Sequence, residues 1–327
     1  MLSEWEIIDY LRRRARRGRG VRVGIGDDAA VLAGSGREDW VVTTDLMIED
    51  VHFLREAQPA RAVGHKAVAR SLSDVAAMAA VARYALIALA VPPELPARWV
   101  KQFFSGALAL ARRHRVALAG GDLSRSGRII ADVQVLGTVE KGKAIRRAGA
   151  KAGDAIFVSG ELGLARLGLA VLRARLAEEE AVVRRAVRAH FYPQPRLRLA
   201  RTLRRFPVSA MIDVSDGLSS DLYQLCLASR VGARLETAQI PATRIASRVA
   251  EELGVTPLEL ALHGGEDYEL LFTLPARAAR RLPRRLGGVV LQRIGTIQRG
   301  RKIVLVDAEG RRKPLAARGW EHFAGRR

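Results

Sequence analysis

The sequence predicts a mixed α/β (α+β) fold divided into two domains, and three observations support this prediction. The chain has 327 residues, more than one small domain usually holds. Apolar runs rich in β-branched residues alternate with longer segments of helical apolar spacing, an order typical of α/β proteins. Hydrophobic residues make up 49% of the chain and charged residues 27%, which provides enough apolar material for buried cores.

The first domain is expected to span residues 1–150. It begins with an amphipathic helix, and the apolar spacing then predicts strands at 21–25, 40–44, 116–119 and 129–139 and helices at 60–81 and 96–114. A turn-rich basic stretch follows at 140–152. We place the domain boundary near residue 150, at the end of this stretch.

The second domain is expected to span residues 151–327. The same spacing predicts a strand at 155–159, a long helical region at 162–205, a strand at 208–214, a helix at 219–229 and a turn running into a strand at 263–274.

The chain is strongly basic, with 55 Lys and Arg against 34 Asp and Glu and a net charge of +21. Such an excess can indicate nucleic acid, an anionic membrane surface or anionic metabolites as partners. The arginines are scattered along the predicted helices, few aromatic residues lie between them, and no zinc-finger or aromatic RNA-binding motif occurs. We therefore interpret the excess as compositional bias on solvated faces, with a polynucleotide partner as the less favoured alternative.

The sequence also limits the cellular setting. Arginine interrupts every apolar run before it reaches membrane-spanning length, and the N-terminus lacks the shape of a secretory signal. The single cysteine, Cys226, excludes an internal disulfide framework and a zinc site built from several thiolates. We expect a cytoplasmic protein without a membrane partner.

Aspartates recur directly after apolar runs, at Asp27-Asp28, Asp45, Asp122, Asp213 and Asp216. Ligand sites in α/β sheets lie where strands end, so we expect these side chains to converge on one crevice. Carboxylates brought together raise one another's pKa unless a cation intervenes, and hard oxygen ligands suit Mg²⁺. Each position alone could be a turn or a helix cap. Together they favour a magnesium site.

Two further motifs bear on phosphate chemistry. The pairs Gly120-Gly121 and Gly264-Gly265 precede acidic residues and allow close backbone approach to phosphate oxygens. The Walker motif, the dinucleotide-binding glycine motif and the protein-kinase motifs do not occur in the sequence. A kinase activity would therefore require a different nucleotide-binding fold.

Taken in order, the motifs resemble those of the thiamine-monophosphate kinase family. They are GIGDDAAV at 24–31, TTD at 43–45, VHF at 51–53, LSDVAAM at 72–78, GGD at 120–122, DVSDGL at 213–218, GGEDYEL at 264–270 and GWEHF at 319–323. The resemblance covers essentially the whole chain, and the last two strings are the most family-specific. The wider superfamily includes aminoimidazole ribonucleotide synthetase, selenophosphate synthetase and a hydrogenase maturation factor.

The resemblance implies a two-domain fold like that of aminoimidazole ribonucleotide synthetase, paired into a homodimer through the N-terminal sheets. It also implies a reaction in which ATP phosphorylates thiamine monophosphate to thiamine diphosphate. The N-terminal domain would bind ATP and Mg²⁺ and form the dimer, and the second domain would complete the enzyme.

The resemblance further implies roles for individual residues. Several Mg²⁺ ions would be held by Asp28, Thr43, Thr44, Asp45, Asp74, Asp122, Asp213 and Asp216. ATP would contact Phe104, Gly121, Asp122, Arg147 and Ser215, and thiamine monophosphate would contact His52, Glu266 and Trp320. The catalytic group would comprise Asp45, Asp74, Asp122 and Arg147.

Elementary chemistry agrees with these roles. A phosphate monoester is a competent nucleophile, so no Ser, Cys or strong base is needed, and positioning with charge neutralisation can supply most of the rate. The guanidinium of Arg147 suits phosphates, and Trp320 offers a flat surface for a cationic ring. His52 could instead be structural, Trp320 could cap the core, and Asp74 could be a solvated helix residue.

Two segments depart from the family pattern, at Leu162–Ala165 and Ala77–Ala80, and neither contains a proposed ligand. Two alternatives to the kinase interpretation stay open at this point. The chain could act on another small acceptor within the superfamily, or it could be a basic binding protein that retains the fold. The intact aspartate and glycine motifs argue against the second.

Overall fold

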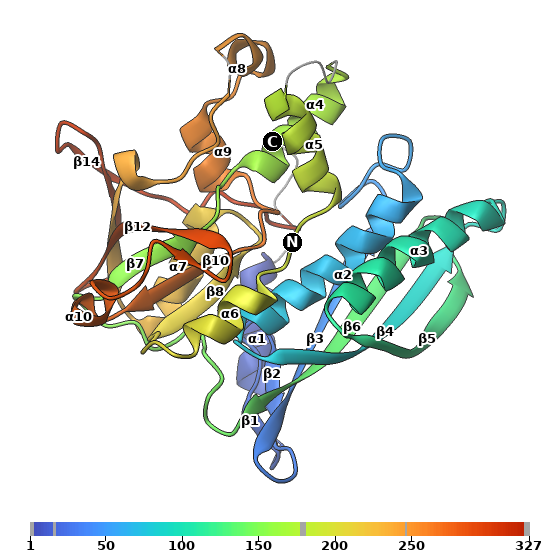
Figure 1. Ribbon diagram of the computed structural model, residues 1–327, viewed down its shortest axis with the longest axis horizontal. Coiled ribbons are helices and arrows are strands. Elements are labelled where there is room, and N and C mark those ends of the chain that lie inside the picture. Colours follow the sequence, from blue (N-terminus) through green and yellow to red (C-terminus); the bar gives the residue numbers. More distant parts are fainter. Residues whose placement is uncertain (1–2, 16–17, 177–180, 246, 324–327) are drawn as a thin grey trace.

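Two β-sheets, one from each half of the chain, form the framework of the protein (Figure 1). The structure is a computed structural model that describes residues 3–15, 18–176, 181–245 and 247–323. Strands up to residue 140 build the first sheet, and strands from residue 155 onward build the second. No helix in these described ranges is both long and apolar enough to cross a membrane.

The first sheet has six strands in the order β1-β2-β3-β6-β4-β5. They are β1 Val21–Val23, β2 Ala30–Leu32, β3 Glu38–Ile48, β4 Val81–Val91, β5 Ala117–Arg125 and β6 Ile130–Glu140. Neighbouring strands are antiparallel except β4 and β5, which are parallel. Burial alternates along β3 and β6, as expected for strands with one covered face.

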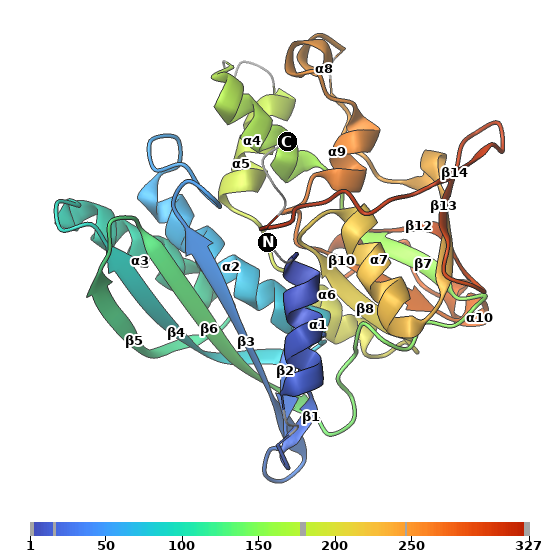
Figure 2. The same ribbon diagram turned by 180° about the vertical axis from the view of Figure 1, so that it is seen from behind.

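Helices α2 (Ala60–Ala77) and α3 (Ala97–Arg113) cover one face of this sheet (Figure 2). Their backbones are in close contact, since a Cβ atom added at Gly64 would lie 1.9 Å from the Phe103 carbonyl oxygen. A Cβ at Gly106 would come equally close to the Arg61 carbonyl, at 1.9 Å. Glycine at these two positions therefore lets the backbones of α2 and α3 approach closely.

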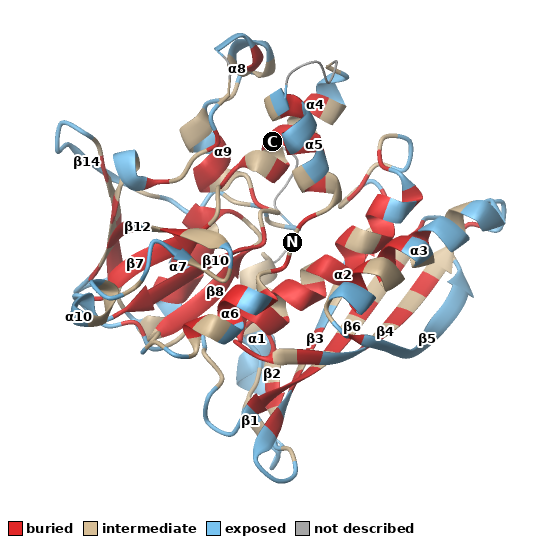
Figure 3. Cartoon of the chain, in the orientation of Figure 1, coloured by how far each residue is buried: buried red, intermediate tan, exposed pale blue. Residues whose placement is uncertain are grey.

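Neither α2 nor α3 lies over the opposite face of the first sheet, and of the described helices only α1 (Glu4–Arg14) lies on that side, near β2 (Figure 2). The exposed apolar side chains of this face include Trp40 at 37%, Tyr84 at 45% and Leu46 at 52% relative exposure. The edge strand β5 is exposed along its whole length (Figure 3). Helix α1 buries none of its residues completely.

The second sheet has eight strands and is mostly antiparallel. Its main order is β14-β13-β9-β12-β7-β10-β8, with β11 paired to β12 and only β13 and β9 parallel. The strands are β7 Ala155–Ser159, β8 Ala210–Val214, β9 Gly232–Glu236, β10 Glu269–Leu274, β11 Arg285–Leu286, β12 Val289–Gln298, β13 Ile303–Val306 and β14 Arg312–Pro314.

The helices of the second half pack around this sheet and against α2. They are α4 Leu164–Ala174, α5 Ala181–Phe191, α6 Leu197–Leu203, α7 Leu218–Ser229, α8 Ser247–Leu253, α9 Pro257–His263 and α10 Ala276–Ala279, with a 3₁₀ turn at Thr237–Gln239. Helix α2 contacts α5, α6 and β8, so it belongs to the first half yet packs against the second.

The central strands β7, β8 and β10 are buried on both faces. On β8, Met211 packs into the core around α2, whereas its neighbours Ala210 and Ile212 pack into the core under α7. One apolar core therefore continues from the first sheet into the second, and the two halves meet along an extensive seam.

Several elements differ from the sequence prediction. The strand predicted at 40–44 continues to Ile48 because β6 pairs with it throughout, so Asp45 lies inside a strand and not at its end. Asp122 likewise lies inside β5. The region 162–205 forms three separate helices, and β4 was not predicted because its alanine-rich sequence resembles the preceding helix. The mostly antiparallel pairing also means that the aspartates do not share one set of parallel strand ends.

Candidate functional site

A cavity of about 290 Å³ lies at the seam between the two halves. Its walls come from the loop before β2, the middle of β3, helix α2, the end of β8, the loop before β10 and the C-terminal segment. Twelve of the sequence-predicted site residues line it: Asp28, Thr43, Thr44, Asp45, His52, Asp74, Arg147, Asp213, Ser215, Asp216, Glu266 and Trp320.

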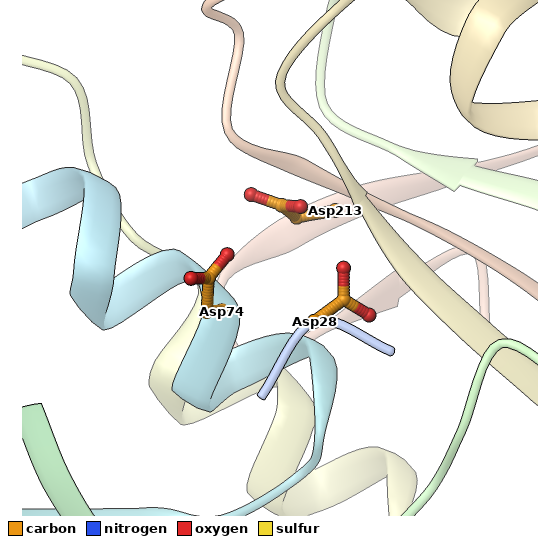
Figure 4. A group of neighbouring side chains, drawn as sticks. All are labelled: Asp28, Asp74 and Asp213. Atoms are coloured by element: carbon orange, nitrogen blue, oxygen red, sulfur yellow. The ribbon is translucent and has the colours of Figure 1, made fainter. Parts of the chain in front are cut away.

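Three aspartates from distant parts of the chain meet at the base of this cavity (Figure 4). Asp28 comes from the loop between β1 and β2, Asp74 from α2 and Asp213 from β8. Each offers a carboxylate oxygen, and the three oxygens lie within 4.8 Å of one another. This separation allows all three to contact one small cation.

Hydrogen bonds fix the orientation of each carboxylate in this cluster. Thr43 Oγ1 donates to Asp74 Oδ2 at 2.5 Å, and Ser73 Oγ donates to Asp213 Oδ2 at 2.6 Å. Arg147 donates to Asp28 Oδ1 from Nη2 at 2.7 Å and from Nε at 3.1 Å. These bonds leave the remaining oxygens available to a ligand.

The electrostatics of the cluster are unfavourable without a cation. Burial, followed by repulsion from Asp45, Asp213 and Asp28, raises the pKa of Asp74 well above its usual value. Burial, with repulsion from Asp28 next in importance, raises the pKa of Asp213 to about 8. The pKa of Asp28 is also raised by burial despite its contact with Arg147. A bound cation would allow all three groups to ionise.

The residues fit a magnesium site. Asp28 Oδ2 and Asp45 Oδ2 are buried and have no hydrogen-bond partner among the described residues. A buried carboxylate oxygen without a hydrogen-bond partner raises the free energy of the folded state, and a bound metal ion would remove this penalty. The available donors are carboxylate and hydroxyl oxygens, which Mg²⁺ prefers. The one cysteine, Cys226, is a buried residue of α7 and does not line the cavity.

A second polar group lies beside the cluster and joins the two halves. Lys66 on α2 is fully buried, and its Nζ lies 2.7 Å from Glu266 Oε1. His190 on α5 approaches the other oxygen, Oε2, at 3.3 Å. Burial alone would raise the pKa of Glu266, but Lys66 and then His190 lower it well below its usual value. Glu266 is therefore a fixed negative charge in the cavity wall.

His52 is held in a neutral form with a defined tautomer. Its Nδ1 accepts a hydrogen bond from the Ile48 amide at 3.0 Å, so the ring proton lies on Nε2. Burial, with the charge of Arg70 next, lowers the pKa of His52 to about 3. His52 Nε2 is buried and has no partner among the described residues. It can donate one hydrogen bond to a ligand.

The loop before β10 is held in a strained conformation against residues 215–216. Glu266 and Tyr268 have φ angles of +60° and +49°, a region that side chains seldom adopt. Gly265 has φ +72°, and a Cβ there would lie 2.7 Å from the Ser215 carbonyl oxygen. The Glu266 amide donates to that same oxygen at 2.7 Å. This contact places Glu266 beside Ser215 and Asp216.

The C-terminal segment forms one rim of the cavity. The Trp320 amide donates to the Asp216 carbonyl oxygen at 3.1 Å, and the indole is 45% exposed. The His322 ring lies with its centroid 5.2 Å from that of His52. Trp320 thus faces the cavity and is not a buried core residue.

Three predicted residues lie outside the cavity of this chain. Gly121 and Asp122 are exposed on β5, and Asp122 pairs with Ala88 across the sheet from the aspartate cluster. Phe104 is half-buried on α3, where its ring meets Phe103 edge to face. The predicted single cluster therefore contains Asp28, Asp74 and Asp213 but not Asp122, because β5 lies at the far edge of the sheet.

Lys66, Arg70 and His190 were missing from the sequence prediction, whereas Asp74 was part of it. Lys66, Arg70 and Asp74 follow one another at four-residue intervals on α2, so they lie along one face of the helix. Arg70 Nη2 lies 3.5 Å from Asp45 Oδ1. The four-residue spacing could have identified Lys66 and Arg70 from the sequence, because charged residues on one side of an alanine-rich helix need partners. His190 carried no comparable signal.

Comparison with known proteins extends these observations. The model of the AIR synthase related protein N-terminal domain matches residues 26–139, and that of the C-terminal domain matches residues 151–308. The thiamine-monophosphate kinase of Rhodopirellula baltica is 39% identical over 303 residues, covering 90% of this chain and 89% of that protein. The Escherichia coli K12 thiamine-monophosphate kinase is 36% identical over 326 residues, covering 98% of each chain.

A solved structure described as AaThiL complexed with AMPPCP and TMP superimposes with a TM-score of 0.88. It is 32% identical and covers 98% of this chain and 97% of its own. Two matching domain models and relatives of this identity over nearly the whole length establish the family. The chain belongs to the thiamine-monophosphate kinases of the AIR synthase related family.

Proposed function

We propose that this chain transfers the γ-phosphoryl group of ATP onto the phosphate of thiamine monophosphate, producing thiamine diphosphate and ADP. The observation that carries the proposal is the cluster of Asp28, Asp74 and Asp213, whose oxygens lie within 4.8 Å of one another in a buried cavity. Such a cluster suits the cation-dependent meeting of two polyanions. The names of the relatives and the nucleotide analogue and TMP in the AaThiL complex support this choice of substrates.

Mg²⁺ ions would be held by Asp28, Asp74 and Asp213, with Thr43, Thr44, Asp45 and Asp216 as further ligands from the same walls. When bound, Mg²⁺ neutralises phosphate charge and so allows the reacting oxygens to approach. Arg147 is fixed by its two hydrogen bonds to Asp28, so its guanidinium is aligned before ATP binds. Ser215 lines the same cavity, and we place it against the nucleotide.

The reaction needs no nucleophilic side chain. An oxygen of the thiamine monophosphate phosphate forms a bond to the γ-phosphorus, and the bond from that phosphorus to the oxygen bridging to the β-phosphate breaks. ADP leaves with the electron pair of that bond. The protein aligns the two phosphates and stabilises the transferred charge, which accounts for most of the rate in such enzymes.

The acceptor binds against His52, Glu266 and Trp320. The neutral His52 donates its Nε2 proton to a phosphate oxygen. Trp320 stacks on the cationic ring of thiamine, and Glu266 supplies the opposite charge. Because ATP is the co-substrate, we place this reaction in the cytoplasm.

The protein acts as a homodimer that pairs the open faces of the two N-terminal sheets. Trp40, Leu46 and Tyr84 expose apolar surface on this face, which is unusual for a monomer. Asp122 lies on the same face, so Asp122 and its neighbour Gly121 contribute to the ATP site of the partner copy. Light scattering should report twice 35.7 kDa, and a stable species of 35.7 kDa at micromolar concentration would contradict this assembly.

The direct test of the activity is ADP release measured with ATP, Mg²⁺ and a panel of acceptors. We expect release to require thiamine monophosphate and to stop when Mg²⁺ is removed with EDTA. If ADP is released with another phosphorylated acceptor but not with thiamine monophosphate, the protein is a member of the superfamily that acts on a different acceptor.

A further inference from the structure

A second, strongly basic region lies along α6, away from the aspartate cluster. Two cavities of about 630 and 650 Å³ adjoin this helix and share Arg201 and Arg205 in their walls. One is bounded by the connection between the two sheets, and the other by the end of α3 and the start of β4. We call the two together the α6 groove. Figure 1 shows α6 beside α2, between the two sheets.

The groove concentrates positive charge on a rigid support. Its basic residues are Arg113, Arg115, Lys143, Arg146, Arg198, Arg201, Arg204 and Arg205. Glu140 is the one acidic residue in either wall, and it pairs with Arg204. Helix α6 is anchored by its buried Leu199 and Leu203, so the backbone that carries Arg198 and Arg201 is held in place.

Most of this charge is uncompensated. The side chains of Arg115, Arg198, Arg201 and Arg205 make no ion pair or hydrogen bond within the described ranges, and all four are exposed. Arg113 donates to Gln194 Oε1 at 2.7 Å, which ties the end of α3 to the segment before α6. His114, in the same wall, keeps Nε2 buried without a described partner. Like charges held close together without counter-ions attract an anion.

The arrangement suits a linear chain of phosphates. Arg198 and Arg201 lie three residues apart on α6, about 4.5 Å along its axis at a helical rise of 1.5 Å per residue, and Arg205 follows in the turn after the helix. Guanidinium groups bind phosphate oxygens with paired hydrogen bonds. Two adjoining hollows that share Arg201 and Arg205 can take the phosphates of a flexible single strand, whereas the phosphates of a duplex lie on the outside of a wider, stiffer cylinder.

One aromatic residue, Phe206, lines the groove and is half-buried. It offers a single stacking surface for a base, which every base can use. With so few aromatic and hydrogen-bonding side chains for base edges, the groove can hold the backbone but cannot read a sequence.

We propose that the α6 groove binds single-stranded nucleic acid through its phosphate backbone, without sequence preference. The basic residues lie far apart in the sequence, at 113–115, 143–146 and 198–205, and the fold gathers them. In the sequence these arginines appear scattered, and only the fold shows that they lie close together. The proposal does not depend on the kinase activity, because none of these residues lines the aspartate cavity.

The test measures fluorescence anisotropy of labelled oligo-uridine and oligo-thymidine strands of about 12 nucleotides with the full-length protein. We expect both strands to bind with similar affinity. The logarithm of the association constant should fall linearly with the logarithm of the KCl concentration, with a slope of about −3 for roughly four phosphates contacted. The double variant Arg201→Gln/Arg205→Gln should bind at least ~10-fold more weakly, with a slope shallower by about 1.4.

The matched control is Arg299→Gln/Arg301→Gln, which removes the same charge from the exposed turn between β12 and β13. It should bind like the wild type. Equal weakening in both double variants would show that only net charge matters, and the proposal would fail. It would also fail if the wild type did not bind, if a duplex of equal length bound more tightly, or if only an inorganic polyphosphate chain bound.

Folding is checked separately. Both double variants should keep the melting temperature and the kinase turnover of the wild type. If Arg201→Gln/Arg205→Gln melts early, Arg115→Gln/Lys143→Gln removes charge from the facing walls and should produce the same loss of affinity. Unchanged binding in that variant would overturn the proposal.

Discussion

At the scale of single residues, Asp74 is the sharpest test of the metal site. Asp74→Asn keeps the side-chain shape and the hydrogen bond from Thr43 but removes one charge from the cluster. We expect kcat to fall at least ~10²-fold, because one preorganised electrostatic group is lost. The melting temperature should not fall, since Asp74 is repelled by Asp45, Asp213 and Asp28. Steady-state kinetics and thermal melts check both expectations.

The matched control for Asp74 is Asp9→Asn, on the exposed helix α1. It removes the same charge outside the cavity and should leave kcat unchanged. Near-normal turnover in Asp74→Asn at ordinary Mg²⁺ would show that this aspartate is not a ligand.

Trp320 tests the acceptor site independently of the metal. Trp320→Ala should raise KM for thiamine monophosphate roughly two- to thirty-fold, the range that stacking on a cationic ring provides. KM for ATP should stay the same, and the melting temperature should change little because the indole is 45% exposed. Trp320→Phe should restore most of the affinity. Equal increases in both KM values, or a large loss of stability, would instead indicate a structural role.

At the scale of elements, α2 and α5 are joined through Glu266, whose two carboxylate oxygens contact Lys66 and His190. Lys66→Met leaves the Glu266 carboxylate without its main counter-charge. We expect a loss of about 3 kcal/mol in the free energy of unfolding, as for other broken buried ion pairs. KM for thiamine monophosphate should also rise, because the carboxylate is no longer held in place.

A double variant separates the two effects. Lys66→Met/Glu266→Gln removes both charges and should regain most of the lost stability, but not the affinity for thiamine monophosphate. Chemical denaturation and kinetics measure the two quantities. If KM in Lys66→Met equals that of the wild type, Lys66 does not position the acceptor site.

The same elements show what could be predicted from the sequence. The helical position of Asp74 and the strands around residues 129–139, 155–159 and 208–214 follow from local apolar spacing, and the structure contains them with small shifts at the ends. Strand β4 was not predicted, because the alanine-rich sequence of 81–91 does not differ enough from the helix before it. Local spacing also cannot tell which strands pair, so it placed Asp45 and Asp122 at strand ends.

The prediction of the site was limited in the same way, because the sequence does not show which residues far apart in the chain are in contact. Motif order identified twelve of the residues that line the cavity. It did not identify Lys66 or His190, whose role depends on contacts between α2, α5 and the loop before β10. Nor could it show that Asp122 lies on the open side of the first sheet, since that depends on the edge position of β5.

At the scale of the whole molecule, the seam between the two halves couples metal binding to stability. Asp213 has a pKa raised to about 8 in the folded protein, above its ordinary value near 4 when unfolded. The folded state then binds more protons than the unfolded state between these values, so the metal-free protein should become less stable as pH rises through this window. Mg²⁺ binds the deprotonated carboxylates and should offset that loss.

We therefore expect the increase in melting temperature on adding Mg²⁺ to be larger near pH 8.5 than near pH 6. Asp213→Asn should reduce this difference, because the amide has no proton to lose, while Asp74 and Asp28 keep their raised pKa values. Thermal melts in EDTA and in Mg²⁺ at the two pH values measure it. A Mg²⁺ effect independent of pH in the wild type would show that the raised carboxylate pKa is not linked to metal binding.

The central claim is direct phosphoryl transfer at the buried aspartate cluster, and one measurement tests it most directly. The protein is incubated with Mg²⁺, thiamine monophosphate and ATP labelled at the γ-phosphate, and the products are separated. Our account predicts that the label appears in thiamine diphosphate, in amounts equal to the ADP formed, and that Asp74→Asn loses this product while it remains folded. Label found in inorganic phosphate, or ADP formed equally well without thiamine monophosphate, would contradict it.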